Sequence, residues 1–128
     1  MPNPDSTVRQ LAALEQCLQI SASHARIQRV LDEELGTYHG LSYSDFILLT
    51  RLLRADNQRL QVSALVPTMG VQASAVVRQL LPLEKTGWLQ RDTQPAADGK
   101  RYVRLRPAGM GRLNEATQTV QQACAALV

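Results

Sequence analysis

The stretch from Leu60 to Gly109 limits the possible fold of this chain more than any other part of the sequence. Two apolar segments come first and are separated by Gly70, a residue type that reaches positive φ without steric cost and so commonly ends a helix. Two short strand-like segments follow Gly87. The predicted parts, in chain order, are a short apolar helix (62–69), a Gly-Val turn (70–71), a longer amphipathic helix (72–86), a strand (88–92), a polar turn containing Pro95, Asp98 and Gly99, and a basic strand (100–106).

The apolar residues of the longer helix predict which of its faces packs against the rest of the domain. Val76, Leu80 and Leu83 recur at i, i+4 and i+7 and therefore share one face. Leu65 and Val66 of the preceding helix are expected to pack against that face. A helix pair with a glycine turn, followed by a two-stranded basic ribbon, is a winged helix-turn-helix. The sequence thus predicts a mainly α fold with a small β-hairpin wing.

The outward residues of the longer helix suit the edges of DNA bases. Arg can bind guanine through two hydrogen bonds, and Gln can do the same with adenine. Gln72, Ser74 and Arg78 are therefore candidates for the major groove. Basic residues on a hairpin suit phosphates or a narrow minor groove, although such residues are also often only a solvated surface. The basic residues that flank the ribbon turn are Arg91, Lys100, Arg101, Arg104 and Arg106.

The distribution of charge is more informative than the formal net charge of +3. Residues 1–40 contain three basic and five acidic side chains, whereas residues 71–106 contain seven basic and three acidic ones. The positive excess therefore lies on the segment that is predicted to contact a polyanion. The length of 128 residues fits one domain. No apolar run follows Met1, and no stretch approaches the ~20 apolar residues of a membrane span, so we expect a cytoplasmic protein.

Long helices are predicted on both sides of this segment. The first is expected to begin at Asp5 or Ser6, after a loose end, and to run to about Leu35, which makes it about 45 Å long. A compact domain of this size does not need such a helix. Its first half is therefore expected to pack on a surface outside the domain, or alternatively to wrap around its own domain. Pro107 pre-sets φ for the last helix, which is expected to reach about Leu127.

The segment between the first helix and the winged head is predicted to contain one more helix. Residues 36–41 are expected to form a turn. Ser42 followed by Asp45 approximates a capping box and predicts a helix start. Residues 55–59 are expected to form a polar loop. The predicted core face of the helix consists of Phe46, Leu49, Leu52 and Leu53.

Four segments together resemble the MarR family of bacterial transcription regulators: HGLSYSDFILLTRL, VSALVPTMGV, SAVVRQLLPLEKTGWLQR and DGKRYVRLRPAGMGRL. The resemblance covers nearly the whole chain. It implies a single domain, residues 1–128, in which dimerisation helices (1–36 and 107–128) flank a winged helix-turn-helix (42–106). It also implies a homodimer that binds double-stranded DNA at a palindromic site, acts as a repressor, and responds to a small ligand or an oxidant.

The same resemblance implies roles for individual residues. Asp98 would brace the wing, and Lys100 or Arg101 would enter the minor groove.

Pro82 departs from the family pattern. It removes one hydrogen bond to the carbonyl of Arg78 at a cost of about 3 kcal/mol in a helix interior, so the helix is expected to kink there or to break after Leu81. The alternative is a divergent winged-helix module that binds protein and has lost specific DNA binding. The residues expected in the major groove are Gln72, Ala73, Ser74, Val77 and Arg78.

The chain contains two cysteines, one in each of the predicted first and last helices. Cys17 and Cys124 fit buried, reduced thiols. Their positions in the first and last helices also resemble those of peroxide-sensing MarR relatives, in which two such cysteines bridge the dimer on oxidation.

A ligand pocket is expected between the first helix and the helix of Phe46. The candidate lining residues are Arg26, Tyr38, His39 and Phe46.

Motifs of enzymes and metal sites are missing from the sequence. There is no G-x-S-x-G, no P-loop and no H-E-x-x-H. His24 and His39 form no metal-ligand pattern with nearby carboxylates or thiols. We therefore expect neither an enzyme nor a metal or cofactor site.

Overall fold

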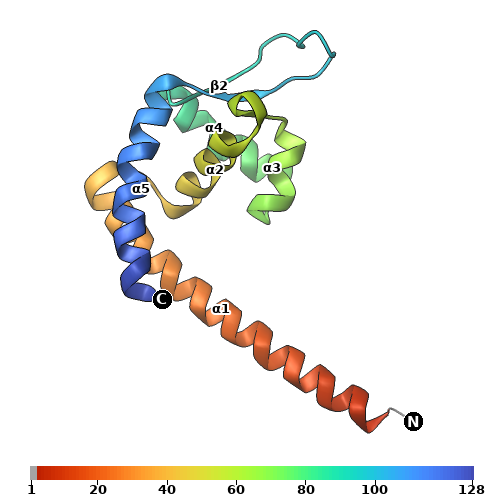
Figure 1. Cartoon of the computed structure of the whole chain (residues 1–128). Helices are drawn as coiled ribbons and strands as arrows, with labels where there is room; N and C mark the ends of the chain where they lie inside the picture. Colours follow the sequence, from red (N-terminus) through yellow and green to blue (C-terminus); the bar gives the residue numbers. More distant parts are fainter. Residues whose placement is uncertain (1–2) are drawn as a thin grey trace.

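The computed structural model describes residues 3–128 and shows five α-helices with a small antiparallel sheet (Figure 1). The first helix extends far beyond the globular part of the molecule, and the last helix packs beside its C-terminal half. The elements are α1 (Pro4–His39), α2 (Tyr43–Arg54), a 3-10 turn η1 (Asp56–Gln58), β1 (Arg59–Leu60), α3 (Val62–Met69), α4 (Ala73–Lys85), β2 (Leu89–Arg91), β3 (Val103–Leu105) and α5 (Pro107–Leu127).

Both ends of α1 differ from the prediction. Asn3 is the cap, because its side chain accepts a hydrogen bond from the backbone N–H of Asp5 at 3.1 Å. Residues 1 and 2 of the expected loose end lie outside the described part of the chain. The predicted turn at 36–41 is wrong for its first four residues, since α1 continues to His39 and ends at Gly40 in the left-handed conformation. His39 Nε2 lies 2.7 Å from Thr119 Oγ1, a contact that joins the added turn of α1 to α5.

The start of α2 and the end of α3 lie where local chemistry predicts them. Ser42 and Asp45 form the expected capping box at the start of α2. Gly70 ends α3 with φ +67°. The predicted break at Pro82 is wrong, because α4 continues through it to Lys85. Pro82 lies in the last turn and is exposed, so its ring meets solvent and not a packed neighbour.

The sheet has three strands in the order β1-β3-β2, not the predicted two. Arg59 pairs with Arg104 and Leu60 with Val103, so part of the expected polar loop is a strand. β2 and β3 are shorter than predicted, three residues each, and a long loop between them forms the tip of the wing (Figure 1).

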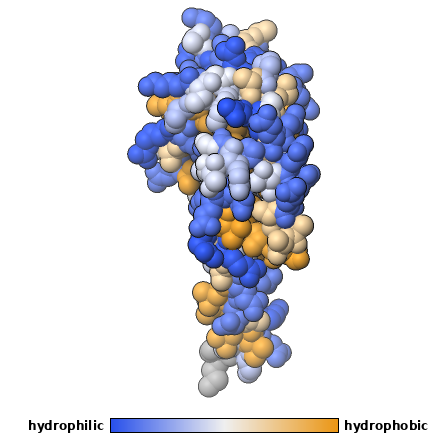
Figure 2. Space-filling view, turned by 90° about the vertical axis from the view of Figure 1, so that its left-hand side faces the viewer, coloured by the Kyte–Doolittle hydropathy of each residue, from blue (hydrophilic) through white to orange (hydrophobic). Residues whose placement is uncertain are grey.

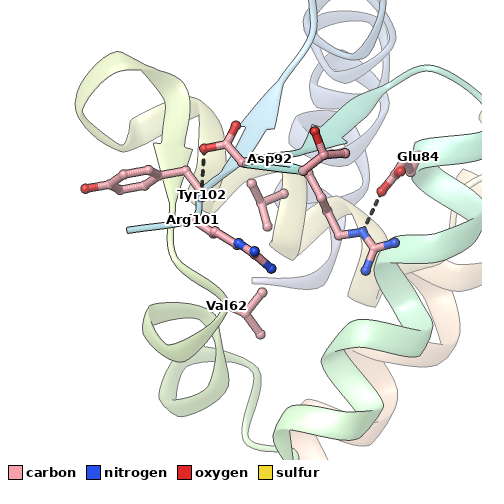
Figure 3. Close-up of a pocket in the computed structure, with 8 residues that line it drawn as sticks. Val62, Glu84, Asp92, Arg101 and Tyr102 are labelled. Atoms are coloured by element: carbon pink, nitrogen blue, oxygen red, sulfur yellow. Dashed lines mark hydrogen bonds and ion pairs between the residues drawn. The ribbon is translucent and has the colours of Figure 1, made fainter. Parts of the chain in front are cut away.

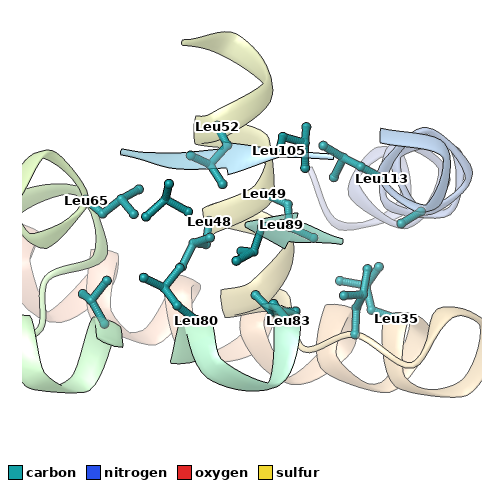
Figure 4. Packing of buried hydrophobic residues seen from close by; sticks show 14 of the residues in the cluster. Leu35, Leu48, Leu49, Leu52, Leu65, Leu80, Leu83, Leu89, Leu105 and Leu113 are labelled. Carbon is teal, nitrogen blue, oxygen red and sulfur yellow. The ribbon is translucent and has the colours of Figure 1, made fainter. Parts of the chain in front are cut away.

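The core is built almost entirely from leucine and valine side chains of all the helices and of β2 and β3 (Figure 4). The predicted seam is confirmed: Leu65, Val76, Leu80 and Leu83 are buried, and Val66 packs against them. Gly109 holds α5 against the sheet, since a Cβ atom there would lie 2.1 Å from the carbonyl oxygen of Trp88.

The first part of α1, residues 4–26, is here called the stalk, and none of its side chains is buried. Apolar patches are visible along it in Figure 2. No helix in the described range, 3–128, is long and apolar enough to cross a membrane. The large apolar residues exposed on the stalk are Val8 (64 %), Leu11 (59 %), Leu14 (53 %), Leu18 (53 %) and Ile20 (60 %).

Candidate nucleic-acid interface

The outward face of α4 carries the side chains that were predicted to read DNA. Because Val76, Leu80 and Leu83 are buried on one face, residues a half-turn away project from the molecule. Gln72 is the N-cap residue, and its side chain makes no capping hydrogen bond. Val77 is half-buried at the edge of this face. The exposed candidates are Gln72, Ala73, Ser74 and Arg78.

The wing is shaped by hydrogen bonds that bridge the loop between β2 and β3. The backbone N–H of Asp92 donates to the carbonyl of Tyr102 at 2.8 Å, and the Tyr102 N–H donates to Asp92 Oδ2 at 3.0 Å. Nearer the tip, the N–H of Ala96 donates to the carbonyl of Lys100 at 2.7 Å. Gly99 turns the chain at φ +80°, which favours glycine.

Asp98 lies at the centre of the wing tip. Its carboxylate accepts the backbone N–H of Lys100 at 2.9 Å and the hydroxyl of Tyr102. These hydrogen bonds, the one from Tyr102 first, lower the pKa of Asp98, and the same contact raises the pKa of Tyr102. The geometry matches the bracing role expected for Asp98, and it holds the backbone of Lys100 in place.

Two of the five predicted basic residues on the ribbon are engaged within the chain. Arg91 Nε lies 2.6 Å from Glu84 Oε2, and Arg104 Nε lies 3.1 Å from Asp92 Oδ1. The hydrogen bond from Arg104 is the main reason that the pKa of Asp92 is lowered. The other three ribbon residues, and Arg78 of α4, form no ion pair with any residue of the described range. The basic excess therefore remains available to a ligand.

Lys100 and Arg101, which were predicted to compete for one role, differ in their surroundings. Arg101 lines a cleft of ≈ 300 Å³ beneath the wing, together with Val62, Glu84 and Arg91. Figure 3 shows its guanidinium directed into that cleft, toward Val62. Both residues are exposed, but Lys100, next to the Gly99 turn, is not among the residues that line the cleft.

The predicted effector residues do not line the clefts between α1 and the winged head. A cleft of ≈ 520 Å³ runs along α1, where Ile20, His24 and Ile27 line it together with Tyr43 at the start of α2. A second cleft, of ≈ 320 Å³, reaches Met69 at the end of α3. Arg26 and Tyr38 are exposed, His39 contacts Thr119, and Phe46 stacks on Tyr43. The effector site stays a prediction, and the four residues expected to line it are not among those that line these two clefts.

Both cysteine thiols are free, but their environments differ. Cys17 is exposed on the stalk, whereas Cys124 is half-buried on α5. Cys124 lies close enough to Tyr43 to contribute, after burial, to the raised pKa of that phenol. The expectation of two buried thiols is wrong for Cys17. Within residues 3–128, no group of three or more His, Cys, Asp or Glu side chains is placed to hold a metal ion.

Sequence reasoning missed the polar contacts that hold α4 in place. Gln79 Nε2 donates to Ser44 Oγ at 2.9 Å and to Asp45 Oδ1 at 3.0 Å. No local pattern could reveal this contact, because more than 30 residues separate its partners. The Glu84–Arg91 pair is closer in sequence, and its opposite charges on either side of Gly87 were a usable signal.

Comparison with known proteins gives structural matches only. No protein-family model and no curated protein matches the sequence. The fold is similar to that of Sco3205, a MarR family transcriptional regulator from Streptomyces coelicolor solved in complex with DNA, with a TM-score of 0.76 and 19 % identity over 100 % of this chain and 76 % of that one. It is also similar to the oxidized form of MarR from E. coli, with a TM-score of 0.74 and 24 % identity over 85 % of this chain and 76 % of that one.

A MarR family regulator from Rhodococcus sp. RHA1 gives a TM-score of 0.78 at 16 % identity, over 89 % of this chain and 80 % of that one. These similarities establish a MarR-type winged-helix fold. They confirm the fold that the sequence motifs predicted.

Proposed function

We propose that this chain is a DNA-binding transcription regulator. The observation that carries the proposal is that the exposed face of α4 and the wing present basic side chains without acidic partners in the described chain. We assign base-edge contacts to Arg78, and contacts with the backbone or minor groove to Lys100 or Arg101. Sco3205, which shares the fold, was solved with DNA.

The stalk supports a homodimer as the functional unit. A 36-residue helix is about 54 Å long, and isolated helical segments are marginal in water unless packing covers an apolar face. A second copy of the chain supplies a matching helix by symmetry. We infer that residues 1–36 and 107–128 form the dimer interface, and that residues 42–106 form the DNA-binding head.

A two-fold dimer with two heads fits a palindromic site. Half-sites about one helical turn apart, roughly 34–36 Å, would let both α4 helices enter successive major grooves. Occupying such a site within a promoter blocks access by other proteins, so we propose repression as the outcome.

The cleft between α1 and α2 is the place where we propose that a small effector acts. It is lined by residues of α1, the helix that would hold the dimer together, and by Tyr43 at the start of α2, the helix that precedes the DNA-binding pair. A molecule bound there can change the angle between stalk and head. An oxidant acting on Cys17 and Cys124 is the alternative signal.

A second candidate function is suggested by the C-terminal half of α4. Leu81 is 45 % exposed beside Pro82, and the two line a shallow hollow with Glu84 and Lys85. This apolar surface favours a winged-helix module that binds a protein. Such a module would bind all duplexes weakly and alike.

A salt series of duplex binding separates the two functions. The duplex upstream of the chain's own gene is compared with a scrambled duplex, while the mass of the protein is measured in the same buffers. A DNA-binding dimer gives tight, preferential binding that falls steeply with salt, since several phosphates are contacted. Equal and weak binding to both, followed by selection of no sequence from a random pool, would refute specific DNA binding.

A further inference from the structure

We propose that Gln79 is a positioning residue of α4: it fixes the rotation of the helix about its own axis and thereby the direction of the side chains that face DNA. The inference rests on the proposed DNA-binding function. The contact of Gln79 with Ser44 and Asp45 is here called the α2–α4 clamp.

The clamp uses the full donor capacity of one amide group. Gln79 Nε2 carries two hydrogens, and its two acceptors are Ser44 Oγ at 2.9 Å and Asp45 Oδ1 at 3.0 Å. All three residues are half-buried. The amide is therefore fixed in direction and not only in position.

The acceptors belong to a rigid part of the molecule. Asp45 belongs to the capping box of α2, in which the Asp45 N–H donates to Ser42 Oγ at 2.9 Å. The start of α2 is also bonded to α1, because the N–H of Tyr43 donates to Asp32 Oδ1 at 2.7 Å. Gln79 thus ties α4 to the point where α1 and α2 are joined.

Helical geometry shows why this contact controls rotation. With about 100° between successive residues, Gln79 lies about 70° to one side of the buried stripe formed by Val76, Leu80 and Leu83. Glu84 lies about 70° to the other side, where it pairs with Arg91 at 2.6 Å. Apolar burial is non-directional and tolerates small rotations, whereas hydrogen bonds are lost when their angles bend.

Small rotations matter for base recognition. Turning α4 by about 20° would move a side-chain tip at the helix surface by about 2 Å. A hydrogen bond to a base edge spans only a few tenths of an ångström of useful distance. Loss of the clamp should therefore lower discrimination between sequences more than it lowers the phosphate-driven affinity that all duplexes share.

The test compares Gln79→Ala with Gln90→Ala, an exposed glutamine of β2 in the same head. The two probes are the duplex that the wild-type protein prefers and its scrambled version. We expect Gln79→Ala to weaken binding to the preferred duplex at least about fivefold, the cost of one mismatched base pair, and to change scrambled-duplex binding less than twofold. Gln90→Ala should change neither. Equal losses on both duplexes, or no loss, would overturn the positioning role.

A donor–acceptor exchange provides the rescue. Gln79→Glu places a second carboxylate against Asp45 and should weaken preferred-duplex binding further, whereas adding Asp45→Asn supplies an amide donor from the other side and restores the wild-type net charge. We expect the double variant to recover to within about threefold of wild type. No recovery would argue against the clamp.

Hydrogen exchange without DNA separates failure of the clamp from failure of the proposed function. Gln79→Ala should speed exchange of the backbone amides of α4 and leave those of α5 unchanged. If the wild-type protein prefers no duplex, specific DNA binding and the positioning role fail together, and the exchange rates still show whether the clamp holds α4. Unchanged rates would refute the clamp itself.

Discussion

The winged head, residues 42–106, buries most of its leucine side chains, whereas the stalk, residues 4–26, exposes its own. In the head, leucines from three helices meet Leu89, Val103 and Leu105 of the sheet in a core that the end of α1 and the start of α5 complete. In the stalk, every large apolar side chain is more than half exposed. The head's structure thus follows from contacts within one chain, whereas the large apolar side chains of the stalk are not covered by any other part of the described chain.

The difference also extends to polar contacts. Head residues cap helices, brace the wing and tie α4 to its neighbours. Past the first turn, no side-chain hydrogen bond or ion pair holds the stalk to another part of residues 3–128. In the homodimer that we propose, the partner would cover the stalk and so set the spacing of two heads whose internal geometry is fixed.

The largest effect is expected from a charge in the apolar stripe of the stalk. Leu11→Glu would place a carboxylate in the proposed dimer interface, where burial of an unpaired charge is strongly unfavourable. We expect a monomer by sedimentation analysis and a loss of about a thousandfold or more in affinity for the preferred duplex, since only one head then binds.

Arg9→Glu is the matched control. Arg9 lies on the side of the helix opposite Leu11, and this substitution changes the net charge more than Leu11→Glu does. It should leave the dimer intact. A wild-type monomer, or a dimer unaffected by Leu11→Glu, would contradict the role assigned to the stalk.

The next effect concerns stability of the head. In Gly109→Ala the new Cβ would lie 2.1 Å from the carbonyl oxygen of Trp88, which already accepts the N–H of Arg106. Because that atom is backbone, α5 must shift, and we expect a loss of about 3 kcal/mol in the free energy of unfolding, measured by urea denaturation. A Cβ atom at Gly111 would lie in open space, so Gly111→Ala should raise the free energy of unfolding by about 0.5–1 kcal/mol. Equal effects at both positions would refute this packing.

Features set by neighbouring residues were predictable from the sequence. The Ser42 capping box, the Gly70 helix end and the start of α5 at Pro107 each depend on local hydrogen bonds or local sterics. The buried stripe of α4 follows from spacing alone. These features explain why the winged-helix fold was recognisable.

Features set by distant partners were not predictable. Arg59 and Leu60 form a strand only because Val103 and Arg104 lie beside them. The polar sequence around Gly36 suggested a turn, yet packing of Leu31 and Leu35 and the contact of His39 with α5 extend α1 past it. For the candidate site, the sequence identified exposed residues of α4 and the wing, but not the contact of Gln79 with Ser44 and Asp45.

Arg78 should carry sequence specificity within the head. Removing a side chain that binds a base edge costs about 1–3 kcal/mol and relaxes selectivity at one base pair. Arg78→Ala is therefore expected to weaken binding to the preferred duplex and to bring its affinity closer to that for a duplex altered at that position. Selection from a random pool measures both. A uniform loss for all sequences would instead assign Arg78 to phosphate contact.

Alanine substitutions of Lys100 and Arg101 at the wing should lower DNA affinity by smaller amounts, and the two amounts should differ. Lys100→Ala is expected to weaken binding to all duplexes about equally. It should also reduce the slope of log affinity against log salt concentration by about one counterion. Arg101→Ala should reduce affinity less, since its guanidinium is directed into the cleft beneath the wing. The reverse order in a salt titration would show that Arg101 leaves the cleft to bind DNA.

The smallest effect is a pH dependence confined to the wing tip. The Tyr102 hydroxyl and the Lys100 N–H hold the pKa of Asp98 below its ordinary value of about 4. The stabilisation from Asp98 is therefore complete above that value and is lost as pH falls through the lowered pKa. The pKa of Tyr102 is raised, so its contribution is complete below about pH 10 and is lost as pH rises through the raised value.

Tyr102→Phe tests this contact directly. An NMR titration of the aspartate carboxyl carbons should show the pKa of Asp98 moving up toward its ordinary value. Asp92 is the internal control, because Arg104 is the main cause of its lowered pKa and remains in the variant. An unchanged Asp98 would mean that the backbone of Lys100 alone positions the wing tip.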